Sequence, residues 1–438
     1  ISEADKKECA ANLMERLKPG CELWKVLCEL DKLEVDGEVL YRPFETLSHG
    51  ERTKVMLAIL FSGYNDFLLV DEPTNHLDQT SREIVKTYLA GKKGFILVSH
   101  DRDLLDACID HVLVLNRRSI EIQSGNFSSW WENKTRKDAF VQMENEKHKK
   151  EIDRLKAAAA RTNQWAEKNE QSKIGFDPIK EHDRSIATRA YIGAKTKKMQ
   201  SRVKQMENRI NKEILEKEGL LQDIENPVDL KLFPLKHHKA VLCSITEYGL
   251  GYKASKGYLF EGLSMEICQG ERVVLKGKNG CGKSSLIKAV LKHASGEEAA
   301  SHDSLIEKGR METASGMIIS YINQDTSFLK GSISKFCRER KIEEYLFCAI
   351  LRQLDFERVQ FAKNMEQFSE GQKKKVLIAS SLLTPAHLYI WDEPLNYIDI
   401  FSRIQIEKLI LEYKPTMLVV EHDVMFCNKI ATKTVDIK

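Results

Sequence analysis

The phosphate-loop pattern at residues 277–284 constrains the fold of this chain more than any other stretch. The segment reads GKNGCGKS and satisfies G-x-x-x-x-G-K-[ST]. The apolar residues 273–275 predict a strand directly before it, and residues 285–291 predict a helix directly after it. Glycines allow backbone amides and a helix N-terminus to face phosphate oxygens at close range. Strand, loop and helix in this order indicate a nucleotide site rather than a chance glycine-rich turn.

Side chains in and near this loop suit ATP and Mg²⁺. Lys283 is expected to contact the β- and γ-phosphates, and the Ser284 hydroxyl to ligate Mg²⁺. Tyr252, 25 residues before the loop, is placed to stack on adenine, although a tyrosine packed in an edge strand is the alternative interpretation. The other residues expected to line the nucleotide are Gly277, Asn279, Gly280, Gly282 and Ser285.

Length and composition limit the class of protein. The 438 residues suggest about three domains, and no stretch approaches the roughly 18–20 apolar residues of a membrane span. The polar start ISEADK does not have the pattern of a signal peptide. Ten cysteines without a C-x-x-C pair indicate neither a disulfide framework nor a zinc site. We therefore expect a cytoplasmic protein with reduced thiols and no membrane contact.

Five features recur in the same order in the two halves of the chain. They are a Ser-x-Gly signature, a helix after it, an apolar strand ending in Asp-Glu-Pro, a turn ending in Asp, and a strand that leads into His-Asp. Apart from the helix, which follows the signature, the segments that carry them, first copy before second, are 47–51 and 368–372, 67–73 and 388–394, 74–78 and 395–399, and 95–101 and 418–423. Such recurrence indicates an internal duplication, and alternating strands and helices predict a largely parallel α/β core in each copy.

These motifs together resemble the ATP-binding cassette domains. Two cassettes on one chain, joined by a charged helical segment and without membrane spans, are similar to the ABC-F family of translation-acting ATPases, and the string DEPTNHLD at 71–78 is especially similar. The resemblance implies an α/β fold with two phosphate-loop NTPase cassettes joined by an α-helical hairpin linker. We expect the first cassette at 1–128, the linker at 129–226 and the second cassette at 227–438.

The first copy departs from the family pattern because it has no phosphate loop. About ninety residues separate loop and signature in the second copy, whereas only 46 residues precede Leu47 in the first. We therefore expect the first cassette to lack its N-terminal part in this sequence. Whether the native protein carries that part is left open.

The family resemblance implies one complete ATP site between the cassettes, built head to tail. Asp392 and Gln324 are then metal ligands with Ser284, Glu393 orients or deprotonates the attacking water, and His422 contacts the γ-phosphate. The opposite cassette contributes its signature residues, Ser48, Gly50 and Glu51.

The reciprocal site keeps its acids, histidine and signature but lacks its loop. Glu72 and His100 would be its catalytic residues and Asp71 its metal ligand. Its signature residues are Ser369, Gly371 and Gln372. Taken alone, an acid pair after a strand can be a solvated turn, and a histidine can be structural. Their recurrence in both copies favours the functional interpretation.

The basic charge of the chain is concentrated between the two copies. Residues 131–220 hold 22 Lys and Arg against 15 Asp and Glu, a balance of +7, whereas the whole chain carries +3. Helical patterns over 132–168 and 194–224 predict an antiparallel hairpin with arms of about 45 Å at 1.5 Å per residue. Glycine and proline interrupt the pattern between them, at 169–193.

A stretch near this interruption is suited to RNA. Between residues 184 and 212 there are nine basic residues and one acid, interleaved with aromatic residues near the start. The alternative is a solvated coiled coil whose charges only maintain solubility. The RNA-contacting candidates are Arg184, Arg189, Tyr191, Lys195, Lys197, Lys198, Arg202 and Lys204.

In the family, this segment is the linker that reaches toward tRNA and the peptidyl-transferase region of the ribosome. A long, irregular tip is similar to that of the antibiotic-resistance members. The resemblance therefore implies an ATPase that binds the 70S ribosome at 23S rRNA and P-site tRNA and protects it from lincosamides, pleuromutilins and streptogramin A. We expect a monomer whose cassettes pair within the chain, without DNA as a partner.

Three alternatives stay open at this point. A housekeeping ABC-F factor that relieves stalled ribosomes would share most of these features. A nucleotide-binding subunit of a membrane transporter would share the cassettes, but a basic hairpin of about 90 residues has no evident use there. A purely binding protein with one dead site would show no ATP turnover.

Overall fold

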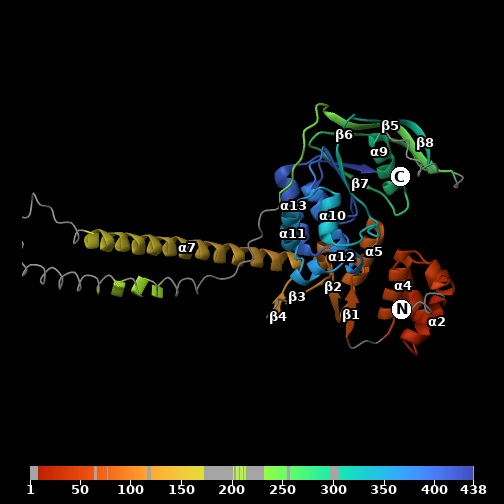
Figure 1. Cartoon of the computed structure of the whole chain (residues 1–438). Coiled ribbons are helices and arrows are strands. Elements are labelled where there is room, and N and C mark those ends of the chain that lie inside the picture. The colour runs from red at the N-terminus through yellow and green to blue at the C-terminus, as the bar shows by residue number, and fades with distance from the viewer. Residues whose placement is uncertain are drawn as a thin grey trace, which may run out of the picture. The chain divides into compact units, whose positions relative to one another are not determined.

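The computed structural model describes residues 8–63, 67–75, 77–115, 120–171, 201, 204–206, 208–210, 212–213, 231–253, 257–295 and 305–437. The chain forms two compact units (Figure 1). One contains residues 1–128 and 227–438, which hold both copies of the repeated motifs, and the other contains residues 129–226.

A five-stranded parallel sheet forms the centre of the second copy. Its strand order is β12-β7-β11-β10-β9, and every neighbouring pair is parallel. All residues of β10 and β11 are buried, as expected for central strands of a parallel sheet covered on both faces. The bounds are β7 Arg272–Lys276, β9 Ile319–Ile322, β10 Leu388–Asp392, β11 Met417–Val420 and β12 Lys433–Asp436.

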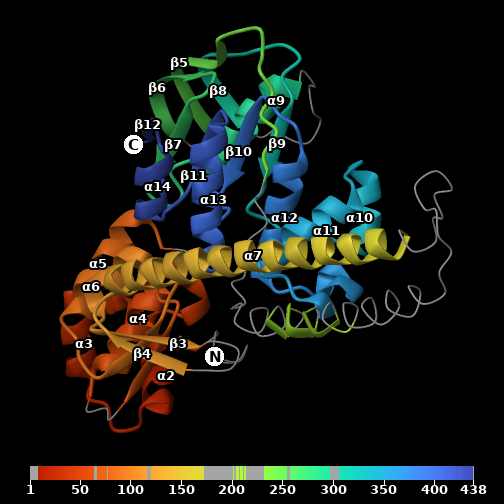
Figure 2. The same ribbon diagram turned by 90° about the vertical axis from the view of Figure 1, so that its left-hand side faces the viewer.

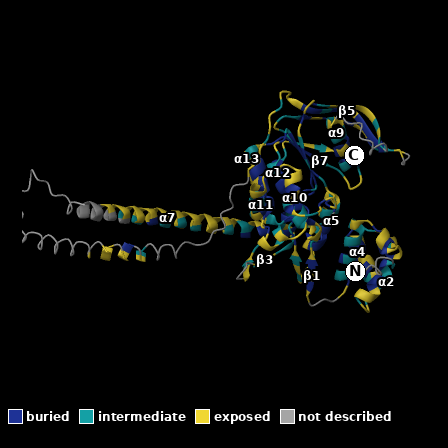
Figure 3. Cartoon of the chain, viewed as in Figure 1, coloured by how far each residue is buried: buried dark blue, intermediate teal, exposed yellow. Residues whose placement is uncertain are grey.

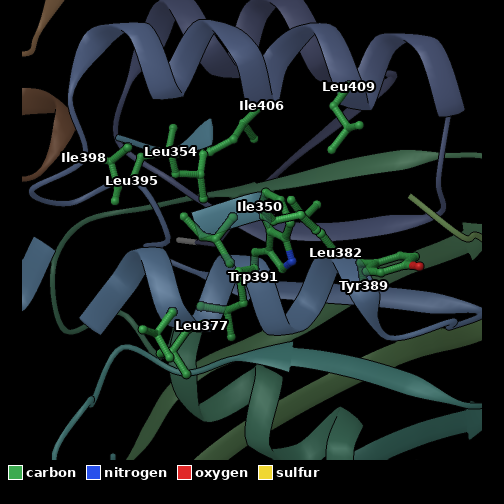
Figure 4. Close-up of a cluster of buried hydrophobic side chains, with 14 of the residues drawn as sticks. Ile350, Leu354, Leu377, Leu382, Tyr389, Trp391, Leu395, Ile398, Ile406 and Leu409 are labelled. Atoms are coloured by element: carbon green, nitrogen blue, oxygen red, sulfur yellow. The ribbon is translucent and has the colours of Figure 1, made fainter. Parts of the chain in front are cut away.

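Successive residues of the central strands supply two separate hydrophobic cores. Leu388 and Ile390 pack on one side, with residues of the helix α9 (Lys283–Ser295). Tyr389 and Trp391 pack on the other side, in the cluster of Figure 4. This alternation is the two-residue period of a strand. The parallel α/β core predicted from the apolar runs is confirmed.

The side of the sheet that carries α9 also faces an antiparallel sheet of order β6-β5-β8. The opposite side is covered by helices, of which α13 and α14 lie in front of the strands in Figure 2. The antiparallel strands are β5 Val241–Tyr252, β6 Tyr258–Cys268 and β8 Leu305–Thr313. The helices are α10 Ile333–Glu339, α11 Glu344–Gln353, α12 Glu370–Leu383, α13 Ile400–Tyr413 and α14 Val424–Ile430, with 3-10 turns η3 Arg358–Ala362 and η4 Met365–Gln367.

The first copy repeats the signature helix, two central strands and the helices that follow them. Strands β1 (Leu68–Asp71) and β2 (Phe95–Val98) are parallel, and β3 (His111–Leu115) pairs antiparallel with β4 (Ile120–Ser124). The helices are α2 Ala10–Leu17, α3 Leu23–Lys32, α4 His49–Phe61, α5 Gln79–Ala90 and α6 Arg102–Cys108, with 3-10 turns η1 Gly37–Tyr41 and η2 Phe44–Thr46. Both strands and the helix after the signature were predicted from the sequence.

One face of β1 and β2 is exposed, unlike the matching face in the second copy. Leu69 and Val98 are 69% and 52% exposed. Their counterparts in the repeat, Ile390 and Val420, are at most 1% exposed because they pack with residues of β7 and α9. Among the described residues of the first copy, no strand or helix takes the places of β7 and α9.

A buried ion pair joins the two copies. Both guanidinium NH groups of Arg102, at the start of α6, donate to the carboxylate of Glu407 on α13, and Lys429 lies 3.1 Å from the same carboxylate. Arg403 donates to the carbonyl oxygen of His100 at 3.1 Å and to Asp423 at 3.0 Å. Side chains of both copies thus neutralise one another inside their interface.

The unit at 129–226 contains most of a single long helix, α7 (Phe127–Gln171), whose residues are largely exposed in Figure 3. The predicted first arm, 132–168, lies within α7. Ile152 of α7 forms a small buried cluster with Ile210 and Leu155. The described residues between 201 and 213 are helical, as predicted. The rest of the predicted second arm and the interruption at 172–193 lie outside the described residues.

Replacing Arg102 by Met should destabilise the unit that contains the two copies. The change leaves the carboxylate of Glu407 buried beside Lys429 alone, and breaking a buried ion pair costs about 3–5 kcal/mol. Equilibrium urea unfolding measures this loss. Lys335→Met is the matched control because its pair with Glu339 is exposed, and such pairs contribute about 0–1 kcal/mol. Equal effects of the two substitutions would contradict the role assigned to Arg102.

Candidate nucleotide site

The predicted phosphate loop connects β7 to α9 in the structure. Gly277, Gly280 and Gly282 all have positive φ angles, of 156°, 82° and 103°. A β-carbon added at Gly277 would lie 2.8 Å from the carbonyl oxygen of Ile437, and so glycine is required there. Lys283 is buried and donates to the carbonyl oxygens of Gly277 at 2.8 Å and Lys278 at 2.9 Å. These two bonds hold the backbone of the loop around the ammonium group of Lys283.

Asp392 lies at the end of β10, next to the loop, and is 1% exposed. It accepts a hydrogen bond from the Ser284 hydroxyl, and burial raises the pKa of its carboxyl to about 6. Its Oδ1 atom has no hydrogen-bond partner within the part of the chain that the structure describes. A hydroxyl and a carboxylate with a spare oxygen are ligands that Mg²⁺ accepts. These two residues fit the predicted metal position.

Glu393 accepts hydrogen bonds from two polar side chains and lies close to a third. Gln324 Nε2 and Asn396 Nδ2 each donate to its Oε2 atom at 2.9 Å. His422 Nε2 lies 3.6 Å from its Oε1 atom. The backbone of Glu393 has a left-handed φ of 48°, which turns the chain away from the strand directly after Asp392. The predicted base, the loop glutamine and the histidine therefore meet at one carboxylate.

The protonation of Glu393 depends on its charged neighbours. Burial alone raises the pKa of this carboxyl, but the His422 ring and the ammonium groups of Lys374 and Lys283 hold the pKa below its ordinary value. A carboxylate that stays ionised while partly buried is suited to accept a proton from water. The charge environment of Glu393 is therefore compatible with the role of base predicted for it.

Asn396 was not predicted as a site residue. The sequence contained a signal for it, because Asn75 occupies the same place in the repeated turn of the first copy. Lys374 was missed as well. Its copy-one counterpart is Thr53, and so the duplication gives no indication of its role.

The first copy reaches the loop of the second copy through Asp78. One carboxylate oxygen accepts from the Ser81 amide at the start of α5, and the other accepts from the Asn279 amide at 3.5 Å. Burial raises the pKa of Asp78, but these amides and the nearby His422 lower it below its ordinary value. The site therefore includes residues from both copies.

The signature residues have a structural role at the starts of α4 and α12. The Ser48 hydroxyl accepts from the Glu51 amide at 3.2 Å, while the Glu51 carboxylate accepts from the Ser48 amide at 2.8 Å. Ser369 and Gln372 form the same reciprocal capping box in the second copy. These bonds cap the helices to which the four side chains belong, and Glu51 also lies 3.7 Å from Arg42. Contact of the signature residues with nucleotide stays a prediction.

The reciprocal residues of the first copy are also close together. His100 Nε2 lies 3.7 Å from Glu72 Oε1, and Glu72 has a left-handed φ of 44°, as Glu393 does. Burial raises the pKa of Glu72 to about 7 despite the opposing charge of Arg403. Asp71, at the end of β1, is exposed. The two copies thus hold equivalent glutamates in different charge environments.

Tyr252, at the end of β5, lies beside the loop. Its hydroxyl is 2.8 Å from the Ser285 hydroxyl, and its side chain is partly buried. Stacking on adenine stays a prediction. Of the RNA-contacting candidates, Lys204 is described and is exposed on a helix. The other seven, Arg184, Arg189, Tyr191, Lys195, Lys197, Lys198 and Arg202, lie outside the described residues.

Gly371→Ala should destabilise the second copy more than Gly50→Ala destabilises the first. A β-carbon at Gly371 would lie 2.6 Å from the carbonyl oxygen of Tyr397, whereas one at Gly50 meets only Leu77 and Ser81 side-chain atoms, at 3.6 and 3.9 Å. Overpacking of this kind costs about 1–3 kcal/mol. Urea unfolding of the two variants provides the measurement. If Gly371→Ala did not lower the free energy of unfolding, the turn at Tyr397 would be able to shift without loss of stability, and the prediction would be wrong.

A family model described as ABC transporter matches residues 3–75 and 260–396. The ribosome protection protein VmlR of Bacillus subtilis (strain 168) is 28% identical over 405 residues, covering 91% of this chain and 70% of VmlR. The ATP-binding protein Uup of Buchnera aphidicola subsp. Acyrthosiphon pisum (strain APS) is 28% identical over 405 residues, covering 88% of this chain and 59% of Uup. The chain thus spans well under the full length of both relatives.

The fold is similar to that of solved tandem-cassette proteins. The archaeal ribosome recycling factor aABCE1, solved with the ribosomal stalk protein aP1, has a TM-score of 0.57 at 19% identity, covering 98% of this chain and 68% of that chain. At this identity the similarity concerns the fold alone. Within the described residues, no helix has the length and apolar character required to cross a bilayer.

Proposed function

We propose that the chain is an ATPase of the ABC-F family and that it uses ATP to control its binding to the ribosome. The observation that carries this proposal is the arrangement around Glu393, where a partly buried carboxylate lies beside Gln324 and His422 and next to a complete phosphate loop. The similarity to a ribosome protection protein supports the ribosome as partner. The +7 charge of residues 131–220 is consistent with contact to RNA phosphates.

In this proposal, each residue of the loop region has a separate task in hydrolysis. Lys283 would exchange its loop carbonyls for phosphate oxygens, and Ser284, Asp392 and Gln324 would hold Mg²⁺. The metal, when bound, neutralises charge on the β- and γ-phosphates. Glu393 orients the attacking water and takes its proton, and His422 faces the γ-phosphate. Asp78 and the signature residues Ser48 and Gly50 complete the site from the first copy.

We further propose that the basic segment lies near P-site tRNA and 23S rRNA on the 70S ribosome. From there it would protect translation from lincosamides, pleuromutilins and streptogramin A, in line with the similarity to VmlR. ATP would favour the bound form of the protein, and hydrolysis would release it. The alternative is a housekeeping factor that relieves stalled ribosomes.

Glu393→Gln, alone and with Glu72→Gln, should separate binding from hydrolysis. Loss of the base should lower the turnover of ATP by about 10²–10⁴-fold, because general-base catalysis contributes on that order. Phosphate release measures turnover, and sedimentation with ribosomes in ATP and in ADP measures association. The variants should remain on ribosomes in ATP.

The matched control is Glu412→Gln, which changes an exposed carboxylate at the end of α13. It should behave as the unmodified chain does. Full turnover by the Glu393→Gln protein would refute the assignment of the base, and absence of ribosome association in either nucleotide would refute the proposed partner.

Replacing residues 170–192 by a short turn should distinguish the protective function from the housekeeping one. The change removes the predicted tip, including Arg184, Arg189 and Tyr191. We expect drug protection to be lost and ribosome association to remain. Growth in each of the three drug classes, with and without the protein, provides the measurement. If the unmodified chain confers no protection and the shortened chain still relieves stalling, the housekeeping alternative is favoured.

A further inference from the structure

Lys374 is a buried cation in the second turn of α12, five residues after the signature Ser369. Its side chain is 3% exposed, and its Nζ atom donates to the carbonyl oxygen of Asn323 at 3.1 Å. Lysine is seldom buried to this extent, because loss of hydration is costly unless partners compensate. Neither the family motif nor the hydrolytic scheme above gives this residue a task.

The charges around Lys374 are those of the hydrolytic centre. Burial lowers the pKa of its ammonium group, and the carboxylates of Glu393, Asp392, Glu421 and Glu370 act in the opposite direction. Glu421 is itself fixed, because it accepts from the Leu395 amide at 3.1 Å. The lysine therefore lies within a group of acids that come from β10, β11 and its own helix.

A second contact joins the same two segments. The Thr326 hydroxyl donates to Glu370 Oε2 at 2.7 Å, close to the start of α12. The short segment from Asn323 to Thr326 is thus attached to the signature helix at both of its ends. Gln324 lies between these attachments, and its amide donates to Glu393. The path from helix to carboxylate has two hydrogen bonds, Lys374 to Asn323 and Gln324 to Glu393.

The residue of the first copy that corresponds to Lys374 makes a different contact. Thr53 takes the place of Lys374 in the repeat, and its hydroxyl donates to the carbonyl oxygen of His49 within α4, at 3.0 Å. The duplication therefore does not repeat the lysine or its bond to another segment.

We propose that Lys374 is a positioning residue for hydrolysis, which fixes the backbone at Asn323 so that Gln324 holds Glu393 in its productive orientation. The inference rests on the ATPase function proposed above and deepens it. It makes the signature helix α12 and the hydrolytic carboxylate parts of one hydrogen-bonded unit. Movement of α12 then changes the orientation of Glu393 without any contact between α12 and water.

Three substitutions at Lys374 separate its charge from its hydrogen bond. Lys374→Met removes both, Lys374→Gln keeps a donor without charge, and Lys374→Arg keeps both. We expect Lys374→Met to lower kcat by about 10-fold or more with KM for ATP little changed, because a hydrogen bond from a charged group contributes on that order. Lys374→Gln and Lys374→Arg should retain more of kcat than Lys374→Met. Lys408→Met, on an exposed position of α13, is the matched control.

A double-substitution cycle tests whether Lys374 acts through Gln324. If it does, Lys374→Met should add little to the loss caused by Gln324→Ala, because the second bond of the path is already absent. Losses that multiply, or a Lys374→Met protein with unchanged kcat, would overturn the inference. Either result would leave the proposed ATPase function standing, provided that the unmodified chain hydrolyses ATP and the Glu393→Gln protein does not.

Hydrogen–deuterium exchange tests the positioning without relying on turnover. In the full chain, Lys374→Met should speed amide exchange in a peptide spanning residues 319–328, whereas Lys408→Met should not. Unchanged exchange in this peptide would overturn the inference even if turnover fell. If the unmodified chain had no ATPase activity, the ATPase proposal would fail and the exchange result alone would decide whether Lys374 fixes this segment.

Discussion

The parallel pairing of β7, β11 and β10 is the constraint on which the rest of the second cassette depends. Parallel strands end at the same edge of a sheet, so the residues that follow them meet there although they are far apart in the sequence. The phosphate loop follows β7, Asp392 ends β10 with Glu393 directly after it, and His422 follows β11. Burial of both faces of the sheet supports this edge and removes water from beneath it.

Burying carboxylates at that edge is unfavourable, and the surrounding cations compensate for it. Asp392 is buried and the adjacent Glu393 is partly buried, and Lys283, Lys374 and His422 lie near them. In the first copy, the main charge that opposes the effect of burial on the equivalent glutamate is Arg403 of the opposite copy, and the pKa of Glu72 is about 7. Duplicated sequence therefore does not mean duplicated electrostatics. Differences in the neighbouring charges decide how fully each glutamate is ionised at neutral pH.

Much of this arrangement could be predicted from local sequence, because apolar runs, caps and glycines act over short distances. The strands around Val274 and Trp391 and the helix after each signature are of this kind. Contacts between remote segments could not be predicted: Arg102 with Glu407, Lys374 with Asn323, and Asp78 with Asn279. Each of these contacts is formed by single residues that no sequence motif marks as partners. The partner of each residue becomes known only once the helices are packed together.

The bare face of β1 and β2 has a thermodynamic consequence. Leu69, Ile96 and Val98 present an apolar strip to water where the other cassette has none. Transfer of such side chains out of water releases about 1.5–3 kcal/mol each when burial is complete. Any polypeptide that lays an apolar surface on this strip gains that energy, and a strand that also pairs with the sheet edge gains hydrogen bonds as well. Covering this strip with an apolar surface is therefore expected to raise the free energy of unfolding of the first copy.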